Sequence, residues 1–145
     1  MKHRACLSLV TALALLLLHG CQTTTTVPSS GTAQNERDAL AVFRQFQTAS
    51  KDKDSAGMAA CLTDDGSKSF FDLWASLMAA EGVQANPDEG FYTLTKDARP
   101  STDSSDANTV RIIIPVALKR TSKIEAIVTG APGAKWRIDK FTRFE

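Results

Sequence analysis

The hydrophobic residues of this 145-residue chain change their spacing once, and that change constrains the fold class most strongly. Between residues 35 and 80 they recur every three to four positions, as on one face of an α-helix. From Val110 to Leu118 every second residue is aliphatic, as on one face of a β-strand. Helices that precede the strands, rather than alternate with them, predict an α+β domain.

Three helices are expected in the first half of this domain. Their predicted spans are residues 35–50, residues 54–62 and about 68–80. Asn35 is the expected N-cap of the first helix, and Asp54 or Ser55 caps the second. Gly82 supplies a stop after the third, because glycine readily adopts the left-handed conformation that ends many helices.

Four strands are expected after the helices. Their predicted spans are Phe91–Lys96, Val110–Leu118, residues 124–128 and Trp136–Phe144, with a polar loop at 97–108. Pro115 lies within the second strand, which suggests a sheet edge or a bulge there. Phe141 is out of step with Trp136 and Ile138, so a β-bulge is expected in the last strand. The predicted architecture is N-terminal helices packed on a curved antiparallel sheet of about four strands.

The first 20 residues have the organisation of an export signal. A basic start, MKHR, precedes a predominantly apolar stretch of 14 residues at 5–18, shorter than the roughly 20 residues that a membrane-spanning helix needs. The segment closes with Leu18-His19-Gly20-Cys21 and resembles the bacterial lipobox, with His19 at a position usually taken by a small residue. The alternative is an uncleaved buried or membrane helix in which Cys21 has no special role.

The lipobox resemblance implies a location. Residues 1–20 would be cleaved as a lipoprotein signal peptide, and Cys21 would carry a diacylglycerol and an N-linked acyl chain such as palmitate. Gln22 follows the cysteine, which by analogy with enterobacterial sorting implies the outer membrane, facing the periplasm. Residues 22–34 are uncharged and rich in Thr and Ser, so 21–34 is interpreted as the lipidated cysteine and a flexible tether. Residues 35–145 form a single domain.

Cleavage before Cys21 would also remove residues that catalytic and metal sites commonly use. His3, His19 and Cys6 precede it, so the mature chain would have no histidine and only Cys61 as a free thiol. Histidine-dependent triads, His-bearing zinc sites and an internal disulfide are thereby excluded. The mature chain has 15 basic and 16 acidic residues, so it lacks the excess of positive charge by which proteins bind the phosphates of nucleic acid. We expect no cofactor, no metal and no catalytic cysteine, and Cys61 is interpreted as a small buried hydrophobe.

The domain resembles the cone-shaped cystatin-like and nuclear-transport-factor-like superfamily, in particular small bacterial lipoproteins with an uncharacterised domain of this kind. The resemblance rests on the Phe43–Phe46 helix, the Lys53-Asp54 break and the closing Gly133–Asp139 segment. It implies a pocket on the concave face of the sheet in many relatives. The residues expected to line that pocket are Tyr92, Ile112, Ile114, Val116, Trp136 and Ile138.

Two functions stay open from the sequence. The first is a non-enzymatic, membrane-anchored binding module for an envelope protein or a small apolar ligand. The second is an isomerase- or hydrolase-like enzyme that uses a pocket acid, for which Tyr92, Asp72 and Asp139 are the candidates. The acidic pairs Asp64-Asp65 and Asp88-Glu89 are expected in solvated turns.

Overall fold

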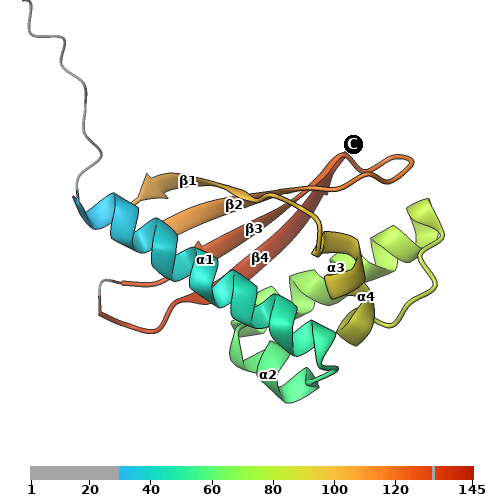
Figure 1. Cartoon of the computed structure of the whole chain (residues 1–145), viewed down its shortest axis with the longest axis horizontal. Helices are drawn as coiled ribbons and strands as arrows, with labels where there is room; N and C mark the ends of the chain where they lie inside the picture. Colours follow the sequence, from blue (N-terminus) through green and yellow to red (C-terminus); the bar gives the residue numbers. More distant parts are fainter. Residues whose placement is uncertain (1–29, 132) are drawn as a thin grey trace, which may run out of the picture.

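The computed structural model describes residues 30–131 and 133–145 (Figure 1). The predicted signal peptide, Cys21 and residues 22–29 of the tether lie outside these described residues. In chain order the elements are α1 (Ser30–Lys51), α2 (Ser55–Ala60), α3 (Asp64–Glu81), α4 (Pro87–Thr95), β1 (Ser101–Asp106), β2 (Thr109–Pro115), β3 (Lys123–Thr129) and β4 (Arg137–Phe144). The strands form one antiparallel sheet in the order β1-β2-β3-β4, which confirms the α+β class.

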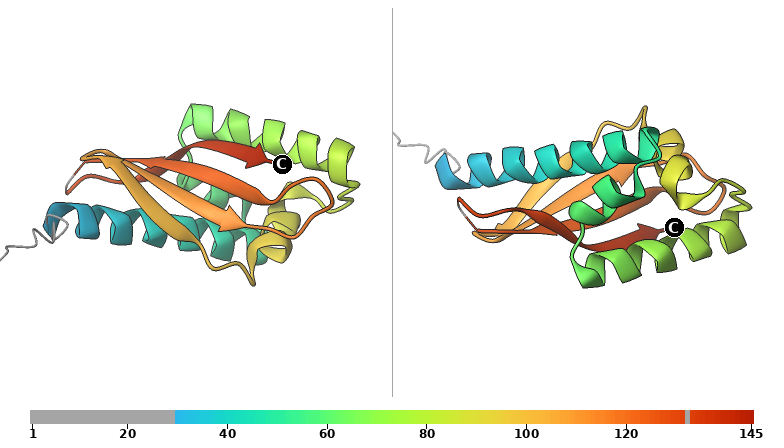
Figure 2. Two further views of the ribbon diagram at one scale, coloured as in Figure 1. Left: turned by 90° about the horizontal axis from the view of Figure 1, so that it is seen from above. Right: turned by 90° about the horizontal axis from the view of Figure 1, so that it is seen from below.

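The helices gather on one side of the sheet and along its β4 edge (Figure 2). α1 crosses the sheet and contacts β1, β2 and β4, whereas α3 lies beside β4. No described helix covers the opposite face of the sheet (Figure 2). The molecule therefore has one filled layer between helices and sheet and one sheet face open to solvent.

Four phenylalanines form the centre of the core. Phe46 of α1, Phe70 of α3, Phe91 of α4 and Phe141 of β4 all contact one another, with ring centroids 5.1 to 5.7 Å apart. At most 4% of each side chain is exposed. Because every ring comes from a different element, this aromatic tetrad joins three helices to the sheet, and buried rings of this kind contribute strongly to stability.

The first helix begins at Ser30, not at the predicted N-cap Asn35. Residues 30–34, which were expected in the tether, are therefore helical. Asn35 is 5% exposed, and its side-chain amide donates a hydrogen bond of 2.8 Å to the Ala107 carbonyl. The long-range contact explains the difference, since it attaches the first turns of α1 to the β1–β2 turn.

The predicted strand at Phe91–Lys96 is wrong, because this segment belongs to helix α4. Pro87 occupies the first turn and Phe91 and Thr95 share the buried side, as a helix of this length allows. A Cβ atom on Gly90 would lie 2.3 Å from Cη2 of Trp74, so glycine lets α4 pack closely on α3. This packing overrides the β-propensity of the Phe, Tyr and Thr residues.

The predicted polar loop at 97–108 is also wrong, because it contains strand β1. β1 is an edge strand that pairs with β2 alone, with Asp103 opposite Arg111. None of its residues is apolar, so the segment has no hydrophobic alternation by which a strand can be recognised. The number of strands was predicted correctly, but the first of them was placed too early.

The bulge predicted in the last strand is confirmed. Ile127 pairs with Lys140 and Val128 pairs with Ile138, which leaves Asp139 without a partner on β3. The extra residue returns Phe141 to the buried side, where it is 4% exposed. β2 ends at Pro115, because proline has no backbone N–H that could continue the hydrogen bonds to a neighbouring strand.

Candidate functional site

Five of the six side chains expected to line a concave pocket belong to the hydrophobic core. Ile112, Ile114 and Ile138 are fully buried, and Val116 and Trp136 are at most 9% exposed. Tyr92, the sixth, is half-buried on α4, where Lys51 Nζ lies 5.9 Å from its ring centroid. Ligand binding by these residues stays a prediction.

The three residues considered for acid chemistry are not brought together. Asp72 is exposed on α3 and lines a shallow groove between α3 and β4, a groove to which neither Tyr92 nor Asp139 contributes. Asp139 is half-buried and accepts a hydrogen bond of 2.8 Å from the hydroxyl of Thr63. General acid chemistry needs its groups within hydrogen-bonding reach of one substrate, and this arrangement does not provide that.

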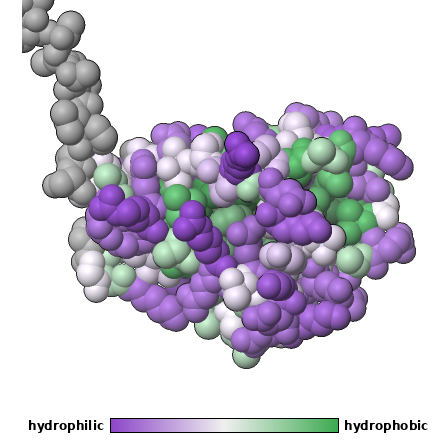
Figure 3. Space-filling view, viewed as in Figure 1, coloured by the Kyte–Doolittle hydropathy of each residue, from purple (hydrophilic) through white to green (hydrophobic). Residues whose placement is uncertain are grey.

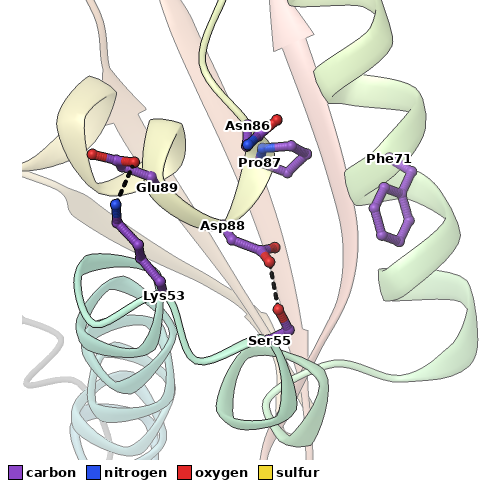
Figure 4. A pocket seen from close by; sticks show the side chains of 7 residues that line it. All are labelled: Lys53, Ser55, Phe71, Asn86, Pro87, Asp88 and Glu89. Carbon is purple, nitrogen blue, oxygen red and sulfur yellow. Dashed lines mark hydrogen bonds and ion pairs between the residues drawn. The ribbon is translucent and has the colours of Figure 1, made fainter.

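A surface cleft lies where the turn after α1 and the first turns of α2 and α4 meet one side of α3 (Figure 4). Its volume is about 500 Å³. The residues that line it are Lys53, Ser55, Phe71, Asn86, Pro87, Asp88 and Glu89. It lies at the far end of α1 from Ser30, and a 22-residue helix separates the two by roughly 33 Å.

Two polar contacts hold the α1–α2 turn against the start of α4 (Figure 4). Lys53 Nζ lies 2.9 Å from Oε2 of Glu89, and the Ser55 hydroxyl donates a hydrogen bond to the Asp88 carboxylate. Lys53 has a φ of 57°, a left-handed conformation that costs a non-glycine residue about 1 kcal/mol. The ion pair is exposed and is worth roughly 0.2–1 kcal/mol. Its main effect is therefore to hold the α1–α2 turn against α4, and these two segments form one wall of the cleft.

The opposite wall of the cleft is apolar. Phe71 is 58% exposed, and Met78, seven residues further along α3, is 47% exposed on the same side of the helix. The small residue Ala75 lies between them and is also exposed. We call Phe71, Ala75 and Met78 the α3 stripe. Apolar side chains exposed along one side of a helix can be buried by a second helix that packs against that side.

The sequence contained a signal for the α3 stripe. The apolar positions of the predicted third helix are Phe70, Phe71, Leu73, Trp74, Leu77 and Met78. Six such residues span more than one face of a helix, so not all of them can point at the same core. The structure buries Phe70, Leu73, Trp74 and Leu77 and leaves the other two outside.

Acidic side chains lie on α3 near the stripe. Asp64, Asp65 and Asp72 are exposed on α3, and none of them has a hydrogen-bond or ion-pair partner through its side chain within the described part of the chain. Residues 52–97 hold nine acidic side chains against three basic ones, whereas residues 119–143 hold seven basic against two acidic. The helical end of the molecule is therefore negative, and the β3–β4 region is positive.

Glu81 connects the end of α3 to the β2–β3 hairpin. Its carboxylate accepts hydrogen bonds from the Thr121 hydroxyl at 2.8 Å and from the Arg120 backbone N–H at 3.0 Å. Desolvation acts to raise the pKa of Glu81, but these hydrogen bonds, one from the Lys119 backbone and the charge of Arg143 together hold the pKa below its usual value.

Cys61 is 1% exposed, which confirms its interpretation as a buried hydrophobe. Burial raises the pKa of its thiol, and the charge of Lys135 opposes this only in part. A neutral, inaccessible thiol is a poor nucleophile.

A second groove lies between the end of α4 and the end of β2, lined by residues that include Leu94, Ala98, Pro115 and Val116. On the side seen in Figure 3, apolar surface gathers toward the end of the molecule that carries the β2–β3 hairpin, far from Ser30. Leu94 and Ala98 are half-buried and Val116 is 9% exposed. The exposed apolar residues of this groove, Pro115 and Ala117, have smaller side chains than Phe71 and Met78 of the α3 stripe.

Comparisons with known proteins add no relative. No family model matches the sequence, and neither a curated protein nor a solved structure gives a significant match. None of the helices in residues 30–131 and 133–145 is long and apolar enough to cross a membrane. The same residues contain no group of three or more Asp, Glu, His or Cys side chains placed to hold a metal ion.

Proposed function

We propose that this chain is a lipid-anchored protein of the bacterial cell envelope whose domain binds another envelope protein without catalysing a reaction. Residues 1–20 are the cleaved signal, Cys21 carries the lipid, and the anchor lies in the outer membrane, facing the periplasm. One observation carries the binding role: Phe71 is 58% exposed in the cleft, and Met78, two turns further along the same side of α3, is 47% exposed.

A protein partner is favoured over a small apolar ligand. The side chains on the helix-facing side of β2 are fully buried in the core, so a ligand would have to displace packed residues to enter there. The α3 stripe, in contrast, is already accessible on the surface. An apolar helix or loop of a partner can bury Phe71 and Met78 without rearranging the core.

The order of the elements supports the cystatin-like and nuclear-transport-factor-like assignment, which we retain as part of the proposal. Helix α1 lies across a four-stranded antiparallel meander, as a cone-shaped domain of that kind requires. Fold alone does not define function, so the binding role rests on the exposed side chains.

The position of α1 suggests how the domain is presented. Only residues 22–29 separate Cys21 from Ser30, and however they fold they reach at most about 30 Å. The cleft lies at the other end of α1 from Ser30, so an anchored domain can direct it away from the membrane surface. A partner in the aqueous compartment could then reach the stripe.

The lipid anchor is tested by growth with radiolabelled palmitate. We expect the labelled band to disappear in a Cys21→Ser variant and to persist in a Cys61→Ala variant, which controls for the loss of a thiol. Label that survives in Cys21→Ser would contradict the anchor.

The binding role is tested by affinity capture of the full-length lipoprotein from solubilised membranes, followed by mass spectrometry. A reproducible partner is expected with the wild type and with Phe144→Ser, and its loss is expected with Phe71→Ser. Phe144 is a suitable control because it is also an exposed aromatic residue but lies on β4. Recovery of no partner, together with a small molecule retained in the purified protein, would overturn the proposal.

A further inference from the structure

We infer that the partner segment is a cationic amphipathic helix that docks along α3 from Phe71 to Met78. The inference rests on the proposed binding function and adds the chemistry of the occupant. Three features of the α3 surface carry it: the spacing of the stripe, the small residue at its centre and the charges on both sides.

The spacing of the stripe fits another helix. Phe71 and Met78 are seven residues apart, which places them about 10 Å apart along the same side of α3. Ala75 lies one turn from each of them and has no bulky side chain, so the axis of a second helix can approach closely there. A partner helix can place apolar residues of its own, at the same spacing, on either side of Ala75.

Carboxylates flank the stripe on both sides. Asp65 and Asp72 lie along one side of it on α3, with Lys68 as the only basic residue of that helix. On the other side, the first turn of α4 carries Asp88 and Glu89, whose carboxylates bind Ser55 and Lys53 on the far side of the cleft from Phe71 (Figure 4). The side chains of Asp65 and Asp72 have no partner within the described residues, so they are available to lysine or arginine side chains of a partner.

The same charges argue against two other occupants. A second copy docked through this face would bring together two segments that each hold nine acidic and three basic residues, and like charges would oppose the contact. An anionic lipid surface would be repelled for the same reason. A cationic helix, in contrast, is attracted by the same negative charges that repel a second copy or an anionic lipid surface.

Site-specific photocrosslinking of the full lipoprotein, in the cells that produce it, tests the inference. Benzoylphenylalanine is introduced in turn in place of Phe71, Met78 and, as a control, Phe144. We expect crosslinks to one protein from positions 71 and 78 and not from 144. Peptide mapping should place them in a segment with basic residues and apolar residues at helical spacing.

The other outcomes separate the inference from the proposed function. A crosslinked segment that is acidic or lacks helical spacing, a crosslink to a second copy, or a crosslink to lipid alone would overturn the cationic helix. A protein crosslinked from position 144 only would overturn this docking site and leave the binding function standing. Absence of protein crosslinks from all three positions would contradict both.

The crosslinked segment can be made as a synthetic peptide. The affinity of each protein variant for this peptide then measures how much the apolar and the charged contacts contribute to binding. Against purified full-length protein, Phe71→Ser should weaken binding by about ten-fold or more, and Asp72→Asn by about two- to five-fold. Asp52→Asn, an exposed acid at the end of α1, should change little. Binding should also weaken as salt is raised from 50 to about 300 mM. Equal effects of Asp72→Asn and Asp52→Asn, or no dependence on salt, would overturn the electrostatic part of the inference.

Discussion

Phe70 and Phe71 are consecutive residues of one helix, yet they belong to two different regions of the molecule. Phe70 is 2% exposed and contacts the three other rings of the aromatic tetrad. Phe71 is 58% exposed on the wall of a cleft that carries charged side chains. Residue type is the same in both cases, so the difference shows that position on the helix decides whether a phenylalanine stabilises the fold or remains accessible to a partner.

The largest effect should separate these two residues. Phe70→Ala removes a ring at the junction of four elements and should lower the free energy of unfolding by about 3–5 kcal/mol. Phe71→Ala changes an exposed side chain and should alter stability by about 0.5 kcal/mol or less. Urea unfolding of both variants checks the comparison, and similar losses in the two would show that Phe71 is also part of the core.

The next effect concerns the contact that places α4 beside the cleft. Gly90→Ala would bring its Cβ within 2.3 Å of the Trp74 ring, so we expect a loss of about 1–3 kcal/mol from overpacking. Gly31→Ala is the matched control, because nothing lies within 4 Å of the added methyl group. Thermal unfolding should show a clear drop for the first variant and none for the second. A neutral Gly90→Ala would mean that α4 is held less closely than the structure shows.

A smaller effect should appear in the pH dependence of stability. The pKa of Glu81 is lower in the folded state than the 4.5 of an unperturbed glutamate, so this carboxylate stabilises the fold above that pH. The contribution is lost as the pH falls below about 4.5 and through the folded pKa. The free energy of unfolding, measured from pH 7 to pH 3, should include this loss in the wild type. In Glu81→Gln the loss due to Glu81 should be absent. Parallel profiles for the two proteins would contradict it.

The smallest effect is expected at Trp136. Its Nε1–H is buried and has no hydrogen-bond partner among the described residues. Trp136→Phe removes this unsatisfied donor while it keeps an aromatic ring, so the gain should offset much of the lost packing, and stability should change by about 1 kcal/mol or less. Guanidinium unfolding measures the change. A loss as large as that of Phe70→Ala would show that the indole N–H has a partner that matters.

Much of the fold was predictable because its signals are local. The alternation from Val110 and the parity break at Phe141 correctly predicted two strands and a bulge, and Gly82 ends α3 in a left-handed conformation with a φ of 71°. Tertiary contacts account for the errors. α4 depends on the fit of Gly90 to Trp74, and β1 depends on pairing with β2, and neither contact is visible in local spacing.

The candidate site was predictable only in part. The acidic pairs Asp64-Asp65 and Asp88-Glu89 are predicted in solvated turns, whereas the structure places them in the first turns of α3 and α4. The cleft itself brings together Lys53, Phe71 and Glu89, which are far apart in the chain, so no motif could reveal it. The excess of apolar residues on the third helix was the one available sign, because a single core face cannot bury them all.

The division of roles between Phe70 and Phe71 is tested most directly by one variant measured in two ways. Phe71→Ser should leave the free energy of unfolding within about 0.5 kcal/mol of the wild type while it abolishes capture of the partner from solubilised membranes. That pair of results would place the function of α3 on its exposed side. Capture that persists in Phe71→Ser, or a loss of stability comparable to that of Phe70→Ala, would contradict the division between the two neighbouring phenylalanines.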